Sequence, residues 1–99
     1  MDRAIRTFLD VLSVQQSASP LTIRAYASDL AQFHAFALGV LKPGGPLAPH
    51  AVTPALIREF LAARDRKGEK KTSLARKLAC LRSFFRYLVR IGQLEVNPA

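Results

Sequence analysis

The sequence has a single cysteine, no tryptophan and only seven acidic residues among its 99 residues. The lone Cys80 excludes an intramolecular disulfide, which suits a reducing cytoplasm, and we expect it to fill space rather than react. Long apolar runs are also missing. The longest uncharged run that is rich in apolar residues, 30–41, is too short to cross a bilayer and includes Gln32 and His34. Near the start, Asp10 interrupts the chain before an apolar run reaches signal-peptide length, so we expect a soluble, cytoplasmic protein without a membrane partner.

Groups for catalysis or for holding a metal ion are not assembled anywhere in the sequence. The two histidines, His34 and His50, lie far apart and have no cysteine or carboxylate at metal-ligand spacing. Gly44 and Gly45 lie between prolines and not after a strand, so they do not form a phosphate-binding loop. No nucleophile motif combines serine, histidine and an acidic residue. We therefore expect no catalytic residue, no metal site, no cofactor and no small-molecule substrate.

The charge that is present is positive and unevenly placed. Fifteen Lys and Arg residues against seven Asp and Glu give a formal net charge of +8, and most of the basic residues lie in residues 51–99. Clustered positive charge is the electrostatic footprint of a nucleic-acid-binding protein, although basic modules that bind acidic proteins share it. A cationic surface that simply faces water is the plainer alternative.

Apolar spacing and turn signals predict four helices, and no segment has the pattern of a strand. The first helix is expected over residues 3–16, with Asp2 as its N-cap. The second begins at Ser19-Pro20, because a capping serine precedes a proline that needs no N–H there, and it ends near Gly39. The sequence therefore predicts an all-α fold.

The third helix begins with the same signal, Thr53-Pro54, and is expected to end near Gly68. The segment before it, residues 42–50, is rich in proline and glycine, a composition that blocks both helices and sheet ladders. We expect one long loop there.

The fourth helix, with Thr72 or Ser73 as its cap and an end before Gly92, has the clearest two-sided pattern. On a helical wheel one arc is apolar and is expected to face the core; it consists of Leu74, Leu78, Leu81, Phe85 and Leu88. The other side carries arginines separated by small residues, namely Arg76, Arg82, Arg86 and Arg90 with Ala75, Ala79, Cys80 and Ser83. Such a helix fits the major groove of DNA, but arginines facing water explain the pattern equally well.

The helix start adds a second indication. Lys70 and Lys71 precede it, and free N–H groups at a helix N-terminus bind phosphate.

Several motifs together resemble one family. Residues 21–33 are similar to the Thr-x-x-x-Tyr-x-x-Asp-Leu-x-x-Phe signature of the N-terminal, core-binding domain of Xer and phage-integrase-type tyrosine recombinases. Residues 53–61, and residues 78–88 followed by Asn97-Pro98, resemble the third and fourth helices of that domain in the same order. The resemblance covers nearly the whole chain. It implies a four-helix, SAM-like bundle of two crossed helical hairpins, with residues 1–99 forming the core-binding, DNA-binding domain.

The resemblance also implies a function. In the family this domain is half of a C-shaped clamp around DNA, and its second and fourth helices approach adjacent major grooves. Carried over by position, the implied DNA contacts are Thr22, Arg24, Ser28, Lys71, Thr72, Ser73, Arg76, Lys77 and Arg82. The implied partners are double-stranded DNA and further recombinase protomers in a tetramer on DNA, and the implied pathway is chromosome dimer resolution. The family's catalytic residues match nothing in this chain, so we expect no DNA cleavage by it alone.

The alternatives differ in class. Phage and integron integrases share the domain, so the pathway is less certain than the DNA clamp. A basic helical adaptor for an acidic protein also fits the charge. A stand-alone helix-turn-helix regulator fits least, because residues 39–53 are too long and too rich in proline for its short turn.

Overall fold

All 99 residues are described by the computed structural model, which is helical apart from its connecting segments and the C-terminal segment after α4. The elements are α1 (Asp2–Val14), α2 (Pro20–Leu41), the short 3₁₀ helix η1 (Pro49–Ala51), α3 (Pro54–Arg66) and α4 (Lys71–Arg90). No strand is present, so the predicted all-α class is confirmed.

Two helices begin with the side-chain caps that the sequence predicts. The Oγ atom of Ser19 accepts a hydrogen bond from the N–H of Thr22 at 3.1 Å, at the start of α2. The Oγ1 atom of Thr53 accepts one from the N–H of Leu56 at 3.1 Å, at the start of α3. Both bonds satisfy an N–H group that the first turn of a helix leaves without a partner.

The predicted starts of the other two helices are wrong. Asp2 is the first residue of α1 and not its cap, and α1 has no capping side chain. α4 begins at Lys71 with Lys70 in the cap position, so Thr72 and Ser73 lie inside the first turn. In both cases the residues with good capping side chains lie inside the first turn, so the helix begins without a side-chain cap.

The end of α2 also differs from the prediction. The helix continues past Gly39 to Leu41, and its C-cap is Lys42, which has the left-handed conformation with φ 47°. A glycine inside a helix costs only about 1 kcal/mol, which packing along the rest of a long helix outweighs. Gly68 and Gly92, by contrast, follow α3 and α4 with φ of 87° and 83°, as expected for residues that end helices.

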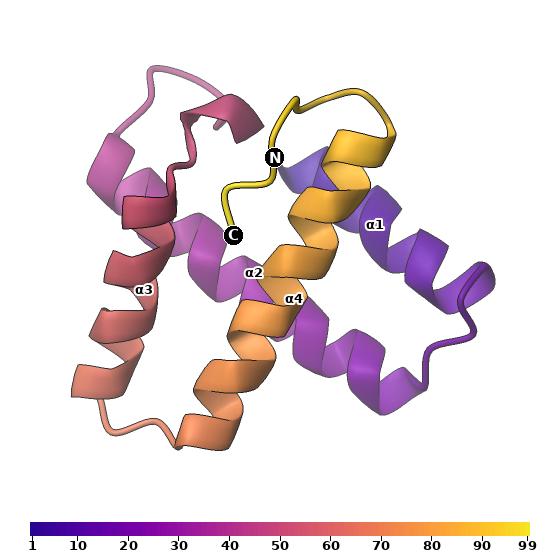
Figure 1. The fold of residues 1–99 in the computed structure, drawn as a ribbon, viewed down its shortest axis with the longest axis horizontal. Coiled ribbons are helices and arrows are strands. Elements are labelled where there is room, and N and C mark those ends of the chain that lie inside the picture. The colour runs from indigo at the N-terminus through magenta and orange to yellow at the C-terminus, as the bar shows by residue number, and fades with distance from the viewer.

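The helices form two hairpins that cross. Figure 1 shows α1 and α2 as one antiparallel pair, α3 and α4 as the other, and α4 lying across α2. α2 and α4 each contact all three of the other helices, whereas α1 and α3 do not contact each other. The predicted bundle of two crossed hairpins is therefore confirmed.

An aromatic core occupies the crossing. Phe33 of α2 meets Phe60 of α3 and Phe85 of α4 edge to face, with ring centroids 5.3 Å and 6.2 Å apart. Phe84 extends the cluster to Phe8 of α1 at 5.4 Å. All five rings are buried, and the edge-to-face arrangement is the favoured one for aromatic pairs. One cluster thus joins the four helices.

The buried side of α4 reaches further round the helix than predicted. Leu81, Phe85 and Leu88 are fully buried, as the apolar arc predicts. Phe84 and Tyr87 are buried as well, because α4 packs against α1 and α2 in addition to α3. The first two leucines of the predicted arc are only partly buried; these are Leu74 and Leu78.

Cys80 lies in the core and not among the arginines of the polar side. Its side chain is 0% exposed, and burial raises the pKa of its thiol to about 12. The expectation that Cys80 fills space agrees with this position, whereas its assignment to the cationic side of the helix is wrong.

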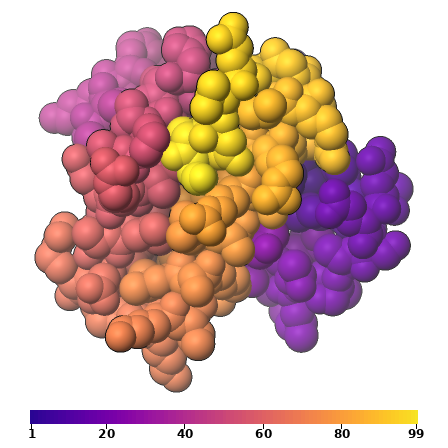
Figure 2. All heavy atoms as spheres, in the orientation of Figure 1, coloured from indigo at the N-terminus to yellow at the C-terminus, as the bar shows by residue number.

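Residues after α4 fold back over the bundle. The Nδ2 atom of Asn97 donates a hydrogen bond to the carbonyl of Arg82 at 3.2 Å, and Leu94 and Ala99 pack against the core. In Figure 2 this yellow segment fills the space between α3 and α4. The Asn97-Pro98 segment is therefore part of the packed structure.

A buried ionic cluster ties α2 to α4. Asp29 of α2 is 1% exposed, and its Oδ1 atom accepts hydrogen bonds from Nη2 of Arg76 and Nζ of Lys77, each at 2.9 Å. Its Oδ2 atom accepts a third from Nε of Arg76, also at 2.9 Å. Lys77 is 2% exposed and lies 3.1 Å from Oε1 of Glu69, which in turn pairs with Arg64 of α3. We call these five side chains the Asp29 cluster.

Both carboxylates of the Asp29 cluster have lowered pKa values. Burial alone would raise the pKa of Asp29, but the hydrogen bonds from Arg76 and Lys77 outweigh it and hold the pKa below the usual 3.8. The pKa of Glu69 is likewise below its usual 4.5, because hydrogen bonds from Arg64 and Lys77 outweigh desolvation. Both groups are therefore ionised at neutral pH.

Removing the central carboxylate should destabilise the fold. We expect Asp29→Ala to lower the free energy of unfolding by about 3 kcal/mol, because Lys77 keeps a buried charge with only one carboxylate beside it. Urea unfolding followed by helical circular dichroism measures the loss. Asp10→Ala is the matched control, since Asp10 is exposed and has no ion pair, and should change stability by less than about 0.5 kcal/mol. Equal effects of the two substitutions would contradict the role given to Asp29.

Stability should also fall in acid. The pKa values of Asp29 and Glu69 are lower in the folded state than in the unfolded chain, so the stabilisation is complete above the unfolded values and disappears as pH drops through the folded ones. We expect the free energy of unfolding to decrease below about pH 5. In the same titration Asp29→Asn should show a smaller decrease than the wild type, and parallel curves would argue against a contribution from Asp29.

Candidate nucleic-acid interface

α4 carries most of the open positive charge of the two crossing helices. Its sequence from Lys71 to Arg90 contains basic residues throughout and no acidic residue. Two of its basic side chains, Arg76 and Lys77, are paired with Asp29. The others are exposed and have no ion pair, and they are Lys71, Arg82, Arg86 and Arg90. With Lys70 at the cap position, these residues form what we call the α4 basic row.

The spacing of the α4 basic row places its arginines on one side of the helix. Arg82, Arg86 and Arg90 follow one another at intervals of four residues, and side chains so spaced lie above one another on a helix. Ala75 and Ala79 are exposed on the preceding turns. Small side chains there leave the helix backbone open to close approach by another surface.

The N-terminus of α4 is open to an anion. No side chain caps it, whereas Ser19 and Thr53 cap α2 and α3. The unpaired N–H groups and the helix dipole make this end positive, and Lys70 and Lys71 add two exposed charges beside it. Negative groups are therefore favoured at this end of α4.

The predicted residues on α2 are exposed and make no side-chain bond to α4. The hydroxyl of Thr22 is 3.0 Å from Oγ of Ser19, as part of the helix cap. Arg24 lies nine residues before the buried Phe33, about two and a half turns, so it points away from the core. Ser28 follows Arg24 by about one turn on the same side. No hydrogen bond or ion pair joins these three side chains to α4.

The structure separates the nine predicted contact residues by exposure. The exposed ones are Thr22, Arg24, Ser28, Lys71, Thr72, Arg76 and Arg82. Ser73 is partly buried. Lys77, which was carried over from the family as a contact, is buried, and its carboxylate partners are the buried Asp29 and the partly buried Glu69. Lys77 cannot reach a ligand without breaking the Asp29 cluster, so it is not a candidate contact.

Some of the features that the predicted contact list does not contain had a signal in the sequence, and others did not. Lys77 lies four residues before Leu81, within the buried arc of α4, and this spacing indicated burial. Arg86 and Arg90 belong to the α4 basic row but not to the nine residues carried over from the family, although their spacing from Arg82 indicated exposure. Asp29 was part of the family signature, but its partners are 47 and 48 residues away in sequence and no local pattern identifies them.

No group of three or more His, Cys, Asp or Glu side chains is placed to hold a metal ion. None of the helices combines the length and the apolar character needed to cross a membrane.

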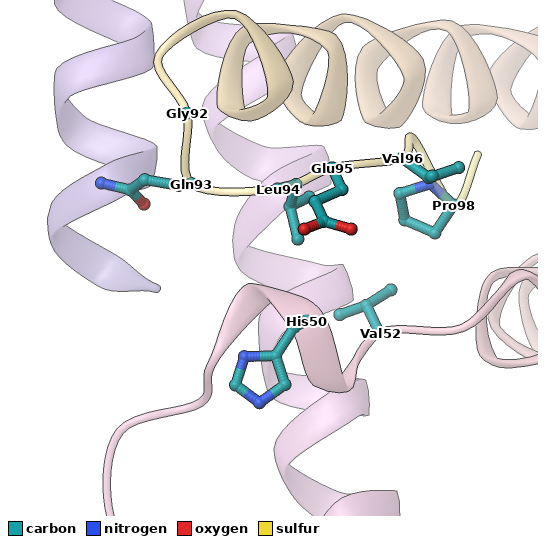
Figure 3. A pocket seen from close by; sticks show the side chains of 8 residues that line it. All are labelled: His50, Val52, Gly92, Gln93, Leu94, Glu95, Val96 and Pro98. Carbon is teal, nitrogen blue, oxygen red and sulfur yellow. The ribbon is translucent and has the colours of Figure 1, made fainter.

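A hollow of about 540 Å³ lies away from the α4 basic row, between η1 and the C-terminal segment. His50 and Val52 lie on one side of it, and Leu94, Glu95 and Pro98 lie on the other (Figure 3). None of the predicted contact residues lines it. Its titratable groups, His50 and Glu95, make no hydrogen bond or ion pair with each other, so the hollow holds no assembled catalytic group.

Comparison with known proteins agrees with the fold and the resemblance. Residues 5–92 match the family described as phage integrase, N-terminal SAM-like domain. A tyrosine recombinase XerC from Thermodesulfovibrio yellowstonii is 41% identical over 95 residues, covering 96% of this chain and 29% of the relative. The XerC protein of Lacticaseibacillus casei is 37% identical over 97 residues, covering 97% and 31%. That of Haemophilus influenzae is 34% identical over 96 residues, covering 97% and 31%. No solved structure matches significantly.

Each alignment covers a much larger share of this chain than of the relative. The chain is matched almost completely, yet it spans only 29 to 31% of the length of these relatives. The family match runs from α1 past the end of α4 and so includes both hairpins. The chain therefore belongs to the family of phage-integrase N-terminal SAM-like domains, in the form that Xer-type tyrosine recombinases carry.

Proposed function

We propose that this chain is the DNA-binding domain of a site-specific tyrosine recombinase and that it holds a recombination half-site through α2 and α4. The observation that carries the proposal is the α4 basic row, which is exposed, free of ion pairs and uninterrupted by any acidic residue of the helix. Membership of a recombinase domain family supports DNA as the polyanion.

The proposed contacts of α4 follow from its geometry. An α-helix fits the major groove, and long cationic side chains on its exposed side can reach the phosphates that border the groove. Ala75 and Ala79 allow the helix to approach closely, while Arg82 and Arg86 extend from the next turns. The open N-terminus of α4 offers N–H groups to a further phosphate.

The proposed contacts of α2 depend more on the family than on charge. Thr22, Arg24 and Ser28 are exposed, but Arg24 is the only basic residue of the helix. These side chains are suited to hydrogen bonds with phosphate or base edges and not to strong electrostatic attraction. In this proposal α2 fixes the position of the domain along the DNA from an adjacent groove, while α4 supplies most of the affinity.

The parent protein follows from the coverage of the relatives. The chain spans less than a third of their length, so we place the residues that break and rejoin DNA in the part of the protein beyond this domain. The proposed partners are double-stranded DNA and further protomers that form a tetramer on paired sites. The proposed pathway, chromosome dimer resolution, rests on the Xer resemblance.

Salt dependence tests the polyanion contact. If the five cations of the α4 basic row each neutralise one phosphate, log affinity should fall against log salt with a slope of about −4 to −5. Fluorescence anisotropy of the chain on a labelled duplex bearing a candidate half-site measures the slope, and a scrambled duplex reports sequence preference. A flat salt response, or no binding at low salt, would overturn the proposal.

Single substitutions test whether α4 is the contacting helix. We expect Arg82→Ala to weaken binding to all duplexes to a similar degree and to reduce the salt slope by about 1, because it removes one phosphate contact. Arg58→Ala is the matched control, since Arg58 is also exposed and has no ion pair but lies on α3. The same anisotropy titration compares both variants. Equal losses would indicate a response to total charge and would contradict a specific role for α4.

A further inference from the structure

Arg76 differs from every other arginine near the proposed interface. Its Nε and Nη2 atoms donate hydrogen bonds to the two carboxylate oxygens of Asp29, both at 2.9 Å. The guanidinium group has five N–H donors, so this side-on contact uses two and leaves three. The free donors include one N–H on each Nη atom, which together form the end-on edge of the group. No protein atom accepts a hydrogen bond from that edge, and the side chain is 42% exposed.

Asp29 is itself held in place. It is 1% exposed, and Lys77 binds its Oδ1 atom from the buried side at 2.9 Å. Lys77 is in turn fixed by Glu69, which pairs with Arg64. The carboxylate therefore cannot turn or move to follow a ligand, and the plane of the Arg76 guanidinium is set by a rigid partner.

This arrangement has two consequences for binding. The entropy of ordering a long side chain is already spent before a ligand arrives, and pre-ordering of this kind favours directional contacts. The charge of Arg76 is offset by Asp29, so it attracts phosphate less strongly than the unpaired arginines do. Arg82 and Arg86 have the opposite properties, because they are exposed and have no ion pair; Arg90 also has no ion pair, although its guanidinium lies over the ring of Tyr87.

The ligand that fits the free edge of Arg76 presents two acceptors side by side. In the major groove guanine offers N7 and O6 in this arrangement, and a bidentate arginine is the commonest specific contact to it. The negative charge of Asp29 does not oppose DNA binding, because two cations neutralise it inside the bundle. Two phosphate oxygens fit the same edge, so it is the charge of Arg76, offset by Asp29, that favours a base edge over a phosphate.

Building on the proposed function, we propose that Arg76 reads a guanine of the half-site through its end-on N–H pair, and that Asp29 is the positioning residue that orients it. Asp29 does not contact DNA. The Asp29 cluster thus joins the packing of α2 against α4 to the reading of one base pair.

Selection from a random pool of duplexes tests both roles whatever the sequence of the target site. The chain and its variants are each incubated with duplexes that contain a randomised 20-base-pair segment, about the length of two turns of DNA, and bound duplexes are sequenced. We expect the wild type to prefer guanine at one position by roughly fivefold to a hundredfold. Arg76→Lys keeps the charge but lacks the planar fork, so it should lose that preference while keeping the others and the salt slope. Asp29→Asn should weaken the same preference, and Asp65→Asn, an exposed carboxylate with no side-chain bond, should leave it intact.

The outcomes separate the two proposals. A wild-type chain that binds no duplex overturns the proposed function and this inference with it, whereas one that binds all duplexes equally overturns this inference alone. Binding in which Arg76→Lys keeps every base preference overturns only the reading role of Arg76. If Asp29→Asn keeps the full guanine preference, Arg76 reads the base without Asp29 and the positioning role is wrong.

A spectroscopic readout on the wild type protects the test against unfolding of the Asp29 variant. The Nε–H of Arg76, hydrogen-bonded to Asp29, should give a protected side-chain signal in nitrogen-15 NMR spectra. We expect this signal to persist when the selected duplex is added, while the Nη signals shift. Loss of the Nε–H signal on DNA binding would overturn the positioning role of Asp29.

Discussion

The arrangement of the crossing helices depends on the pairing of the buried Asp29 carboxylate with Arg76 and Lys77. It lies inside the bundle, where an unpaired charge is very unfavourable, so it requires the two cations that α4 provides. Apolar packing brings α2 and α4 together. Three hydrogen bonds to one carboxylate add a directional constraint, which favours the rotation of α4 that turns Arg76 and Lys77 toward Asp29.

α4 combines two demands that usually fall on different helices. It contacts all three other helices and supplies much of the aromatic core, yet its remaining side carries the open charge. The division is possible because its cations are of two kinds. Lys77 is buried and pairs with Asp29, and Arg76 pairs with Asp29 while remaining partly exposed. Arg82 and the arginines that follow it have no ion pair. A helix with fewer basic residues could not both balance Asp29 and present a charged surface.

The fold could be predicted from sequence wherever the signal was local. In Ser19-Pro20 and Thr53-Pro54 the signal for a helix start lies within the first four residues of the helix, and both predicted caps are present in the structure. The start of α4 was misplaced because Thr72 and Ser73 have good capping side chains while the residue that begins the helix has none. Burial of Lys77 was missed for a different reason. A charged residue is ordinarily expected at the surface, and the burial of Lys77 depends on two carboxylates, Asp29 far away in sequence and Glu69 just before α4.

The position of Cys80 affects how the domain responds to oxidants. Thiols are attacked as thiolates, and with a pKa of about 12 only roughly one molecule in a hundred thousand carries a thiolate at neutral pH. The sulfur is also 0% exposed, so reagents cannot reach it while the bundle is folded. α4, the helix with the most exposed and unpaired charge, can therefore contain a cysteine near its centre that does not react with oxidants while the domain is folded.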